Sequence, residues 1–513
     1  MGSAIYWLMT LESGAHERRL AIGTVAQQGT QAVIYLSSLA VITVLARELS
    51  LDAFGTYALF VSFSVYLLFA QGSIEGAAVK MFASDPDPVA RERVFSTAVV
   101  LYLAAGAIAG VFLLACALAL PGLLDVPDEL RSDARLGTAL TGLAAFAGWP
   151  LRACRDTLRA LQLFRRVALA DAIGYLTMAG LSIGLALAGA PLWLLIALGG
   201  SVPLFVGLAS VVIFGWTRLS LRARRRSLER RTVFEFVRMA GHLLAVGAAD
   251  LVIYSLDRVV LASFRSTAVV GLYEGPVRAH NLVRLTSGTL AFAVLPAASE
   301  YQAKGDVTRS RDLMVRGTRY VTALVVPITI VIVLLSTEIL TVWLGPDFAE
   351  AGTAMAIFVG YWLVNVNSVV PGGMLVAYGE TAWLARYAWA VALVSLALSI
   401  ALAPELGLDG VVLGTTLPYV LSFPVLMRFA LRKLPFSLAD VARRAWLPAY
   451  SLGAVLAGAI LVVRETVALD SLLPVLAVCA GALLAYWAAY YALWLDRAER
   501  GLIRDVARGM FRA

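Results

Sequence analysis

Five polar side chains lie close together inside one apolar segment, 267–299: Glu274, Arg278, His280, Asn281 and Arg284. A guanidinium group binds phosphate through paired hydrogen bonds, and a carboxylate can exchange a proton or bind a cation. A charge inside a membrane segment costs about 2.5–3.5 kcal/mol, so it needs a partner or a water-filled cavity. On a helix with about 100° per residue, the five side chains fit a sector about 160° wide. They predict a wet, cavity-lining face, unless Glu274 and Arg278 form a structural pair at i,i+4.

Further polar residues interrupt other apolar segments. Glu75, Asp250 and Asp257 are our candidates for coupling to H⁺ or Na⁺, because a carboxylate within a membrane segment can take up either cation. Gln27 and Gln31 share a helix face at i,i+4, where they would bind sugar hydroxyls or another helix. The sequence has no nucleotide fingerprint, no Ser/His/Asp set and no metal spacing among its three histidines and three cysteines. We expect neither catalytic residues, nor a metal, nor a bound cofactor.

The segments that carry these residues are those of an all-α polytopic membrane protein. Hydrophobic residues make up 60% of the chain and charged residues 15%, against about 25% charged residues in a soluble protein. The net charge of +8 therefore belongs to loops that set topology and not to a nucleic-acid surface.

About 14 segments are long enough to cross a bilayer as helices. We place them at 21–46, 53–79, 94–120, 136–151, 167–190, 192–217, 236–264, 267–299, 313–344, 349–378, 381–403, 407–431, 445–463 and 471–495. Three small-xxx-small spacings, Gly106–Gly110, Gly180–Gly184 and Gly410–Gly414, predict close helix packing.

Arginine clusters on alternate connections. The basic connections include 152–166, 218–235, 304–312 and 432–444, and the connections between them carry few basic residues. Because cytoplasmic loops of membrane proteins are enriched in lysine and arginine, both termini are predicted to be cytoplasmic.

An internal repeat organises the chain. Leu45-Ala46 and Gly55 return as Leu261-Ala262 and Gly271, at an offset of 216 residues (261 − 45 and 271 − 55). Membrane proteins built from two similar halves are typically transporters, because substrate sites form between repeats.

We therefore predict two six-helix lobes followed by two C-terminal helices. The predicted parts are a cytoplasmic N-terminus (1–20), an N-lobe (21–217), a basic linker (218–235), a C-lobe (236–431), two further spans (432–495) and a cytoplasmic tail (496–513). The first copy of the repeat places Ala58, Ser62, Ser64, Val65 and Leu68 where the second places its five polar residues. Because the shared scaffold does not require these charges, their presence in one half favours a functional role.

Several ordered motifs resemble the Wzx-like polysaccharide and oligosaccharide flippases, a branch of the multidrug/oligosaccharidyl-lipid/polysaccharide exporter superfamily. They are Ala46-Arg47-Glu48-Leu49, Phe54-Gly55-Thr56-Tyr57, Leu256-Asp257-Arg258, Val270-Gly271-Leu272-Tyr273, Leu295-Pro296, Trp343-Leu344-Gly345-Pro346-Asp347-Phe348 and Leu375-Val376-Ala377-Tyr378-Gly379.

This resemblance implies a V-shaped helical bundle that opens to one side of the membrane at a time. It implies translocation of undecaprenyl-diphosphate-linked sugars, such as lipopolysaccharide O-antigen units, across the bacterial cytoplasmic (inner) membrane. Arg278 and Arg284 would hold the diphosphate. The implied partners are the lipid-linked oligosaccharide, membrane lipids and a polysaccharide polymerase or export machinery.

Other functions stay open at this point. A multidrug or cation antiporter of the same superfamily would use the aromatic residues Tyr254, Tyr273, Tyr361 and Trp362. A lipid-II flippase would be expected to carry an arginine within its first span, which here has none between Arg19 and Arg47. A membrane glycosyltransferase or polymerase would need larger outer loops, and a scaffold would leave the one-sided charges unexplained.

Overall fold

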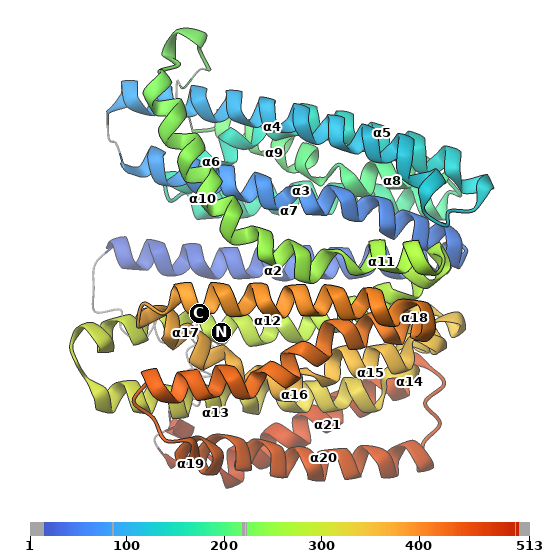
Figure 1. Ribbon diagram of the computed structural model, residues 1–513, viewed down its shortest axis with the longest axis vertical. Coiled ribbons are helices and arrows are strands. Elements are labelled where there is room, and N and C mark those ends of the chain that lie inside the picture. Colours follow the sequence, from blue (N-terminus) through green and yellow to red (C-terminus); the bar gives the residue numbers. More distant parts are fainter. Residues whose placement is uncertain (1–14, 85–86, 218–220, 222, 498, 502–513) are drawn as a thin grey trace. The chain divides into compact units, whose positions relative to one another are not determined.

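The computed structural model describes residues 15–84, 87–217, 221, 223–497 and 499–501, except for the side chains of 15–28, 225, 245–255 and 289–293. Its regular elements over these ranges are all helical, which confirms the predicted all-α class (Figure 1). The chain divides into two compact units, Thr10–Leu272 and Tyr273–Ala513, here called the N-terminal and C-terminal units. The lobe boundaries inferred from the repeat stay a prediction.

The N-terminal unit contains the helices that precede α12 and the first residues of α12. These elements are α2 (Ala15–Glu48), α3 (Leu51–Ser84), α4 (Pro88–Leu123), α5 (Asp128–Gly148), η1 (Trp149–Leu151), α6 (Arg152–Ala160), α7 (Phe164–Leu187), α8 (Leu192–Gly200), α9 (Val202–Gly215), η2 (Arg225–Ser227), α10 (Arg230–Ser255) and α11 (Asp257–Phe264).

The C-terminal unit contains the rest of α12 and all later helices. These elements are α12 (Thr267–Ala303), α13 (Val307–Leu334), α14 (Ser336–Leu344), η3 (Pro346–Ala351), α15 (Gly352–Gly360), α16 (Trp362–Asn365), η4 (Val366–Ser368), α17 (Val369–Ala377), α18 (Thr381–Lys433), α19 (Leu438–Val441), η5 (Ala442–Trp446), α20 (Leu447–Thr466) and α21 (Leu472–Leu493).

Many of these helices can cross a membrane. Within the described ranges, 9 helices or helix groups are long and apolar enough, and the bent pair α8 and α9, at 51°, brings the number to 10. One of the 9, α18, contains a break at Gly407, where φ is 58° and ψ is −126°. Only glycine readily adopts this backbone conformation, and the break lies where the sequence separates 381–403 from 407–431. The protein is therefore a multi-pass membrane protein, and the number of 14 crossings stays a prediction.

The repeated glycines pack against each other. A Cβ added to Gly55 of α3 would lie 1.7 Å from the Thr267 carbonyl oxygen, and one added to Gly271 of α12 would lie 2.9 Å from the Leu51 carbonyl oxygen. The contact is reciprocal, because 267 − 51 and 271 − 55 both equal the repeat offset of 216. Thr267 Oγ1 also donates to Asp52 Oδ1 at 2.9 Å. Absence of a side chain at both positions is what lets the first turns of α3 and α12 cross.

Two of the three predicted glycine pairs mediate close packing. A Cβ on Gly110 would lie 3.1 Å from the Gly142 carbonyl oxygen where α4 meets α5. A Cβ on Gly414 would lie 2.3 Å from the Ser399 nitrogen, where the two arms of α18 meet. The prediction for Gly180–Gly184 was wrong, since no atom that the structure describes lies within 4 Å of a Cβ at either position. Glycine spacing permits close packing but does not choose which helix face meets a neighbour.

The described part of the basic segment between α9 and α10 is held by the start of α4. The Arg224 N–H donates to Ser96 Oγ at 3.1 Å, and Ser227 Oγ donates to Glu92 Oε1 at 3.2 Å. Arg93 and Glu229 form an exposed ion pair at 2.9 Å. This segment is therefore docked within the N-terminal unit by polar contacts.

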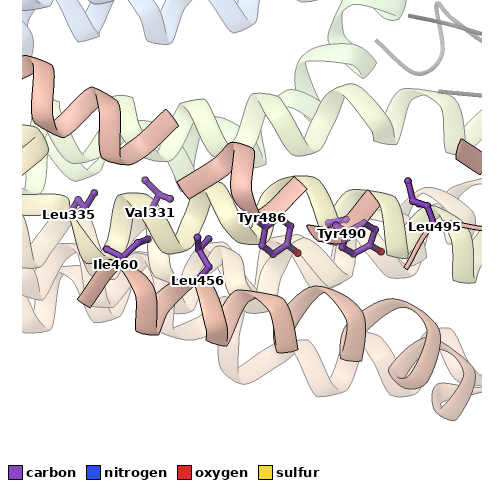
Figure 2. Packing of buried hydrophobic residues seen from close by; sticks show 8 residues of the cluster. Val331, Leu335, Leu456, Ile460, Tyr486, Tyr490 and Leu495 are labelled. Atoms are coloured by element: carbon purple, nitrogen blue, oxygen red, sulfur yellow. The ribbon is translucent and has the colours of Figure 1, made fainter. Parts of the chain in front are cut away.

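The last helices of the C-terminal unit share an apolar core. Val331 of α13 and Leu335, which directly follows this helix, pack with Leu456 and Ile460 of α20 and with Tyr486 of α21 (Figure 2). The Tyr486 hydroxyl donates to the Ala449 carbonyl at 3.1 Å. These contacts hold α20 and α21 against α13.

The segment after α21 returns to α13 through Glu499, whose side chain is 9% exposed. Tyr320 Oη donates to Glu499 Oε1 at 2.5 Å, and Arg319 forms an ion pair with the same carboxylate. Burial raises the pKa of Glu499, but hydrogen bonds from Tyr320 and from the Asp496 N–H, together with Arg319, outweigh burial and hold this pKa below its ordinary value.

We expect Glu499→Gln to lower the thermal unfolding midpoint at pH 7. A carboxyl whose pKa is lowered by folding stabilises the protein above its unfolded pKa, and this contribution is lost as the pH falls through the folded pKa. The difference between wild type and variant should therefore shrink as the pH falls below about 4. Melting curves from pH 7 to pH 3, with Glu465→Gln as the exposed control, measure it. A difference that does not change with pH would contradict a charge-based role.

Candidate functional site

The five polar residues of the segment 267–299 all lie on α12, which confirms that they share one helix: Glu274, Arg278, His280, Asn281 and Arg284. The helix continues through Pro276 and Pro296. A proline within a membrane helix is tolerated when neighbouring groups satisfy the freed carbonyl.

Glu274 and Arg278 are adjacent on α12. Arg278 Nη2 lies 3.5 Å from Glu274 Oε2, at the i,i+4 spacing predicted for a structural pair. The Glu274 side chain is 2% exposed and that of Arg278 is 24% exposed. The buried carboxylate therefore orients a guanidinium group that keeps part of its surface accessible.

His280 lies in an aromatic cluster of the C-terminal unit. Its ring stacks on Phe358 with centroids 4.2 Å apart and on Tyr361 at 5.6 Å. Trp362 Nε1 donates to His280 Nδ1 at 3.3 Å. His280 is 2% exposed, so these rings occupy the space that a substrate would need. We therefore leave it out of the binding set that we propose below.

The other two residues of the set are more accessible. Arg284 is exposed and Asn281 is half-buried, and both lie on α12 beyond the aromatic cluster. Arg278 and Arg284 are six residues apart, which corresponds to about 9 Å along the helix axis.

The remaining candidates lie on α2, α10 and α11. Gln31 is exposed on α2, and Gln27 lies on the same helix with its side chain outside the described residues. The Asp250 side chain also lies outside them, on α10. Asp257 is buried in the first turn of α11, where the helix dipole favours a negative charge.

Glu75 belongs to a buried charge cluster of the N-terminal unit. Its carboxylate meets three arginines of α6: Arg155 Nη1 at 2.8 Å, Arg152 Nη2 at 3.4 Å and Arg159 in close contact. Arg155 also donates a bidentate pair of hydrogen bonds to Asp171 of α7, from Nε to Oδ1 at 2.6 Å and from Nη2 to Oδ2 at 2.7 Å. A monovalent cation at Glu75 would therefore compete with these guanidinium groups for the carboxylate.

The 3₁₀ turn η1 positions this cluster. Trp149-Pro150 ends α5 and starts α6, because proline cannot continue the hydrogen-bond ladder of the preceding helix. α6 then presents Arg152, Arg155 and Arg159, which lie on one side of the helix at spacings of three and four residues. The carboxylates of α3 and α7 meet this side.

Asp156 adds a third carboxylate to the same region. It is 2% exposed, and its Oδ2 accepts a hydrogen bond from Tyr102 Oη of α4 at 2.6 Å. Its Oδ1 has no hydrogen-bond partner among the described residues. A cavity of about 10 Å³ lies beside it, lined also by Thr157, Ala78 and Phe95. This volume is close to that needed by one water molecule.

The sequence contained a signal for this cluster that its topological interpretation missed. The positive-inside pattern explains Arg152, Arg155 and Arg159 as topology signals, and it gives no role to Asp156 or Asp171. Glu75 and Asp171 each lie near the end of an apolar segment, at the membrane side predicted for these arginines. Carboxylates and arginines that lie at the same side of the membrane and need partners are expected to form ion pairs with each other.

Comparison with known proteins identifies the family. A family model described as "Polysaccharide biosynthesis protein" matches residues 44–352. The match includes both repeated glycines and all of α12. The chain belongs to this family.

Relatives of this family member include named flippases. The probable low-salt glycan biosynthesis flippase Agl15 of Haloferax volcanii is 22% identical over 221 residues, 43% of this chain and 46% of that protein. The probable flippase AglR of the same organism is 24% identical over 330 residues, 64% of this chain and 65% of that protein. The chain thus aligns with about half of the first relative and about two thirds of the second. The uncharacterized membrane protein EpsK of Bacillus subtilis is 23% identical over 403 residues, 74% of this chain and 76% of that protein.

Solved structures share the fold of this polysaccharide biosynthesis protein. The lipid II flippase MurJ, in an inward closed conformation, has a TM-score of 0.69 at 13% identity and covers 92% of this chain and 99% of its own. An inward-facing multidrug resistance MATE family transporter of the MOP superfamily has a TM-score of 0.60 at 13% identity, with coverage of 78% and 94%. The polysaccharide family inferred from the motifs is therefore confirmed by the family model, and the fold is that of these polytopic transporters.

Proposed function

We propose that this protein is a flippase for a polyprenyl-diphosphate-linked oligosaccharide, such as an O-antigen or other polysaccharide repeat unit. It would move this cargo from the cytoplasmic to the outer leaflet of the bacterial cytoplasmic membrane, with both of its own termini in the cytoplasm. Membership of the polysaccharide biosynthesis family and the names of Agl15 and AglR support this proposal.

The observation that carries the cargo assignment is the pair of accessible guanidinium groups on α12. Arg278 is partly exposed and oriented by buried Glu274, and Arg284 is exposed. A diphosphate cannot enter hydrocarbon without replacement of its hydration. Guanidinium groups supply this replacement because their planar fork binds phosphate oxygens in pairs. Asn281, Gln27 and Gln31 complete the proposed set as partners for sugar hydroxyls.

Transport would proceed by alternating access of the two repeat halves, without a bound cofactor. Coupling to H⁺ or Na⁺ is assigned to Asp250 and Asp257, since three arginines already surround Glu75. The further partners that we propose are membrane lipids and a polysaccharide polymerase or export machinery.

The described aromatic residues that suggested a multidrug antiporter are buried, which argues against this alternative. Tyr273, Tyr361 and Trp362 are 2%, 6% and 4% exposed, so their rings are not available to stack on a drug. The lipid-II alternative still lacks an arginine in α2 between Arg19 and Arg47. No specific contact among the described residues favours a drug or lipid II as the substrate.

We expect Arg278→Gln and Arg284→Gln each to reduce glycan export strongly, because each removes a charged hydrogen-bond donor from the diphosphate. Loss of one charge-assisted contact of about 1.5–3 kcal/mol corresponds to an export rate about 10- to 100-fold lower. Export is measured as surface glycan in a strain that lacks its own flippase. Purified variants should also transport a fluorescent polyprenyl-diphosphate sugar more slowly in liposomes.

Arg386→Gln is the matched control, since Arg386 is an exposed arginine at the start of α18. This variant should export at the wild-type rate, and all three variants should reach the membrane in equal amounts. Export at the wild-type rate by both α12 variants would contradict the proposed contacts with the diphosphate. Drug resistance on overexpression, with unchanged surface glycan when the gene is deleted, would favour the antiporter.

A further inference from the structure

A second charged pocket lies in the C-terminal unit, away from the proposed α12 contacts. It is about 280 Å³ in volume and lies between α13, η5 and the segment after α21. This volume is near the lower end of the range for small-molecule sites. Its charged lining residues are Asp312, Arg316, Arg319, Arg444, Asp496 and Glu499.

One wall of this pocket is fixed. Arg319 and Glu499 neutralise each other in an ion pair, and the Asp496 carboxylate accepts the Glu499 N–H at 2.8 Å. Leu495, which precedes Asp496 in the chain, is 8% exposed and belongs to the apolar core that also includes residues of α13, α20 and α21 (Figure 2). The wall is therefore held in place without a ligand.

The other charges of the pocket are available to a ligand. Arg316, Arg444 and Asp312 are exposed and form no ion pair with any residue that the structure describes. Two guanidinium groups thus share the pocket with the carboxylates of Asp312 and Asp496. After the Arg319–Glu499 pair is set aside, positive and negative groups are equal in number.

The pocket lies where membrane helices end. α13, α20 and α21 all belong to segments apolar enough to span a bilayer. Leu447, three residues after Arg444, is 57% exposed, and Leu493 and Trp494, just before Asp496, are 68% and 39% exposed. Exposed apolar side chains and tryptophan at helix ends are typical of the boundary between hydrocarbon and headgroups. The pocket is therefore placed at headgroup level.

We propose that this pocket binds the headgroup of a phospholipid that carries both a phosphodiester and a primary ammonium, as phosphatidylethanolamine does. Arg316 and Arg444 bind the phosphodiester through charge-assisted hydrogen bonds. The carboxylates of Asp312 and Asp496 accept hydrogen bonds from the ammonium group.

Charge balance selects this headgroup over the other common ones. A net anionic headgroup such as phosphatidylglycerol would leave the carboxylates of Asp312 and Asp496 unpaired beside a negative ligand. The quaternary ammonium of phosphatidylcholine has no N–H to donate. A neutral headgroup with separated charges and N–H donors satisfies both arginines and both carboxylates.

Lipid binding to the purified full-length protein in detergent tests this proposal. Phosphatidylethanolamine, phosphatidylglycerol and phosphatidylcholine with matched acyl chains are titrated, and bound lipid is counted by native mass spectrometry. We expect phosphatidylethanolamine to bind at least about tenfold more tightly than the other two. The double variant Arg316→Gln/Arg444→Gln should lose this preference, and Asp312→Asn should shift it towards phosphatidylglycerol.

Arg443→Gln is the matched control, because Arg443 is exposed beside Arg444 but does not line the pocket. It should bind lipid as the wild type does. Melting curves in lipid-free detergent verify that each variant is folded. Equal binding of the three lipids, or an unchanged preference in the folded double variant, would overturn the proposal.

Water-soluble phosphoethanolamine distinguishes a lipid from a soluble phosphate ester. Displacement of the bound lipid by phosphoethanolamine at the concentration at which phosphatidylethanolamine itself binds would overturn the lipid as the ligand and favour a soluble phosphate ester. Retention of the lipid, with preference intact, would support it with the acyl chains contributing to binding. Glycan export by the double variant is measured in parallel, so that failure of this site is distinguishable from failure of the α12 contacts.

Discussion

Gly55→Ala is expected to destabilise the N-terminal unit by about 3 kcal/mol or more, because the new methyl group overlaps backbone that cannot rotate away. The added Cβ would lie 1.7 Å from the Thr267 carbonyl oxygen and 2.8 Å from the Gly271 nitrogen. Relief requires that the first turns of α3 and α12 move apart. Such a movement would also disturb the hydrogen bond between Thr267 and Asp52.

Alanine substitutions at two other glycines, Gly271 and Gly72, should have smaller effects on stability than Gly55→Ala. In Gly271→Ala the Cβ would lie 2.9 Å from the Leu51 carbonyl oxygen, so we expect a smaller loss of stability. Gly72 lies on α3, and no described atom lies within 4 Å of an added Cβ. Gly72→Ala should therefore be neutral or stabilising by up to about 1 kcal/mol, because alanine favours helix over glycine.

The thermal unfolding midpoint and the yield of monodisperse protein in detergent measure the series. The expected order of stability is Gly72→Ala, then Gly271→Ala, then Gly55→Ala. A Gly55→Ala protein as stable as Gly72→Ala would show that α3 and α12 do not cross at the repeated glycines.

Arg155→Met is expected to cost about 3–5 kcal/mol of stability, the range found when one partner of a buried ion pair is removed. Arg155 is 12% exposed and joins the carboxylates of Glu75 and Asp171. Glu75 would keep Arg152 and Arg159, but Asp171 would lose both hydrogen bonds that Arg155 donates to it. The buried and uncompensated charge of Asp171 accounts for most of the expected cost.

A double variant separates the cost of an orphaned charge from the value of the pair. Arg155→Met/Asp171→Leu should be more stable than the sum of the two single variants predicts, because no charge on Asp171 is left without a partner. Arg165→Met, at an exposed position of α7, is the control and should stay within about 0.5 kcal/mol of wild type. Equal midpoints for Arg155→Met and Arg165→Met would contradict the buried cluster.

Sequence patterns were sufficient for the membrane class, the repeat and the helix that carries the proposed phosphate contacts. Hydrophobic length gives α4, α7, α20 and α21 nearly as they are observed, since a bilayer requires about 20 apolar residues for each crossing. The i,i+4 spacing of Glu274 and Arg278 also predicted their pair, because helix geometry alone brings such residues together.

The tertiary structure decided which polar residues face partners inside the protein. The helical wheel placed His280 at the edge of a wet face, but Phe358, Tyr361 and Trp362 enclose its ring from segments more than 70 residues away. A helical wheel also cannot show the partners of Glu75, because its arginines come from another helix, α6.

The sequence by itself determined the hydrophobic segments, the arginine-rich loops and the repeated glycine, because each depends on local composition or on a fixed offset. Only the tertiary structure showed that Gly55 and Gly271 touch, that three arginines of α6 meet Glu75, and that α13, η5 and the chain after α21 enclose a pocket of balanced charge. Those contacts join residues far apart in the chain. Their geometry depends on which helix faces pack together, and the period of a single helix does not carry that information.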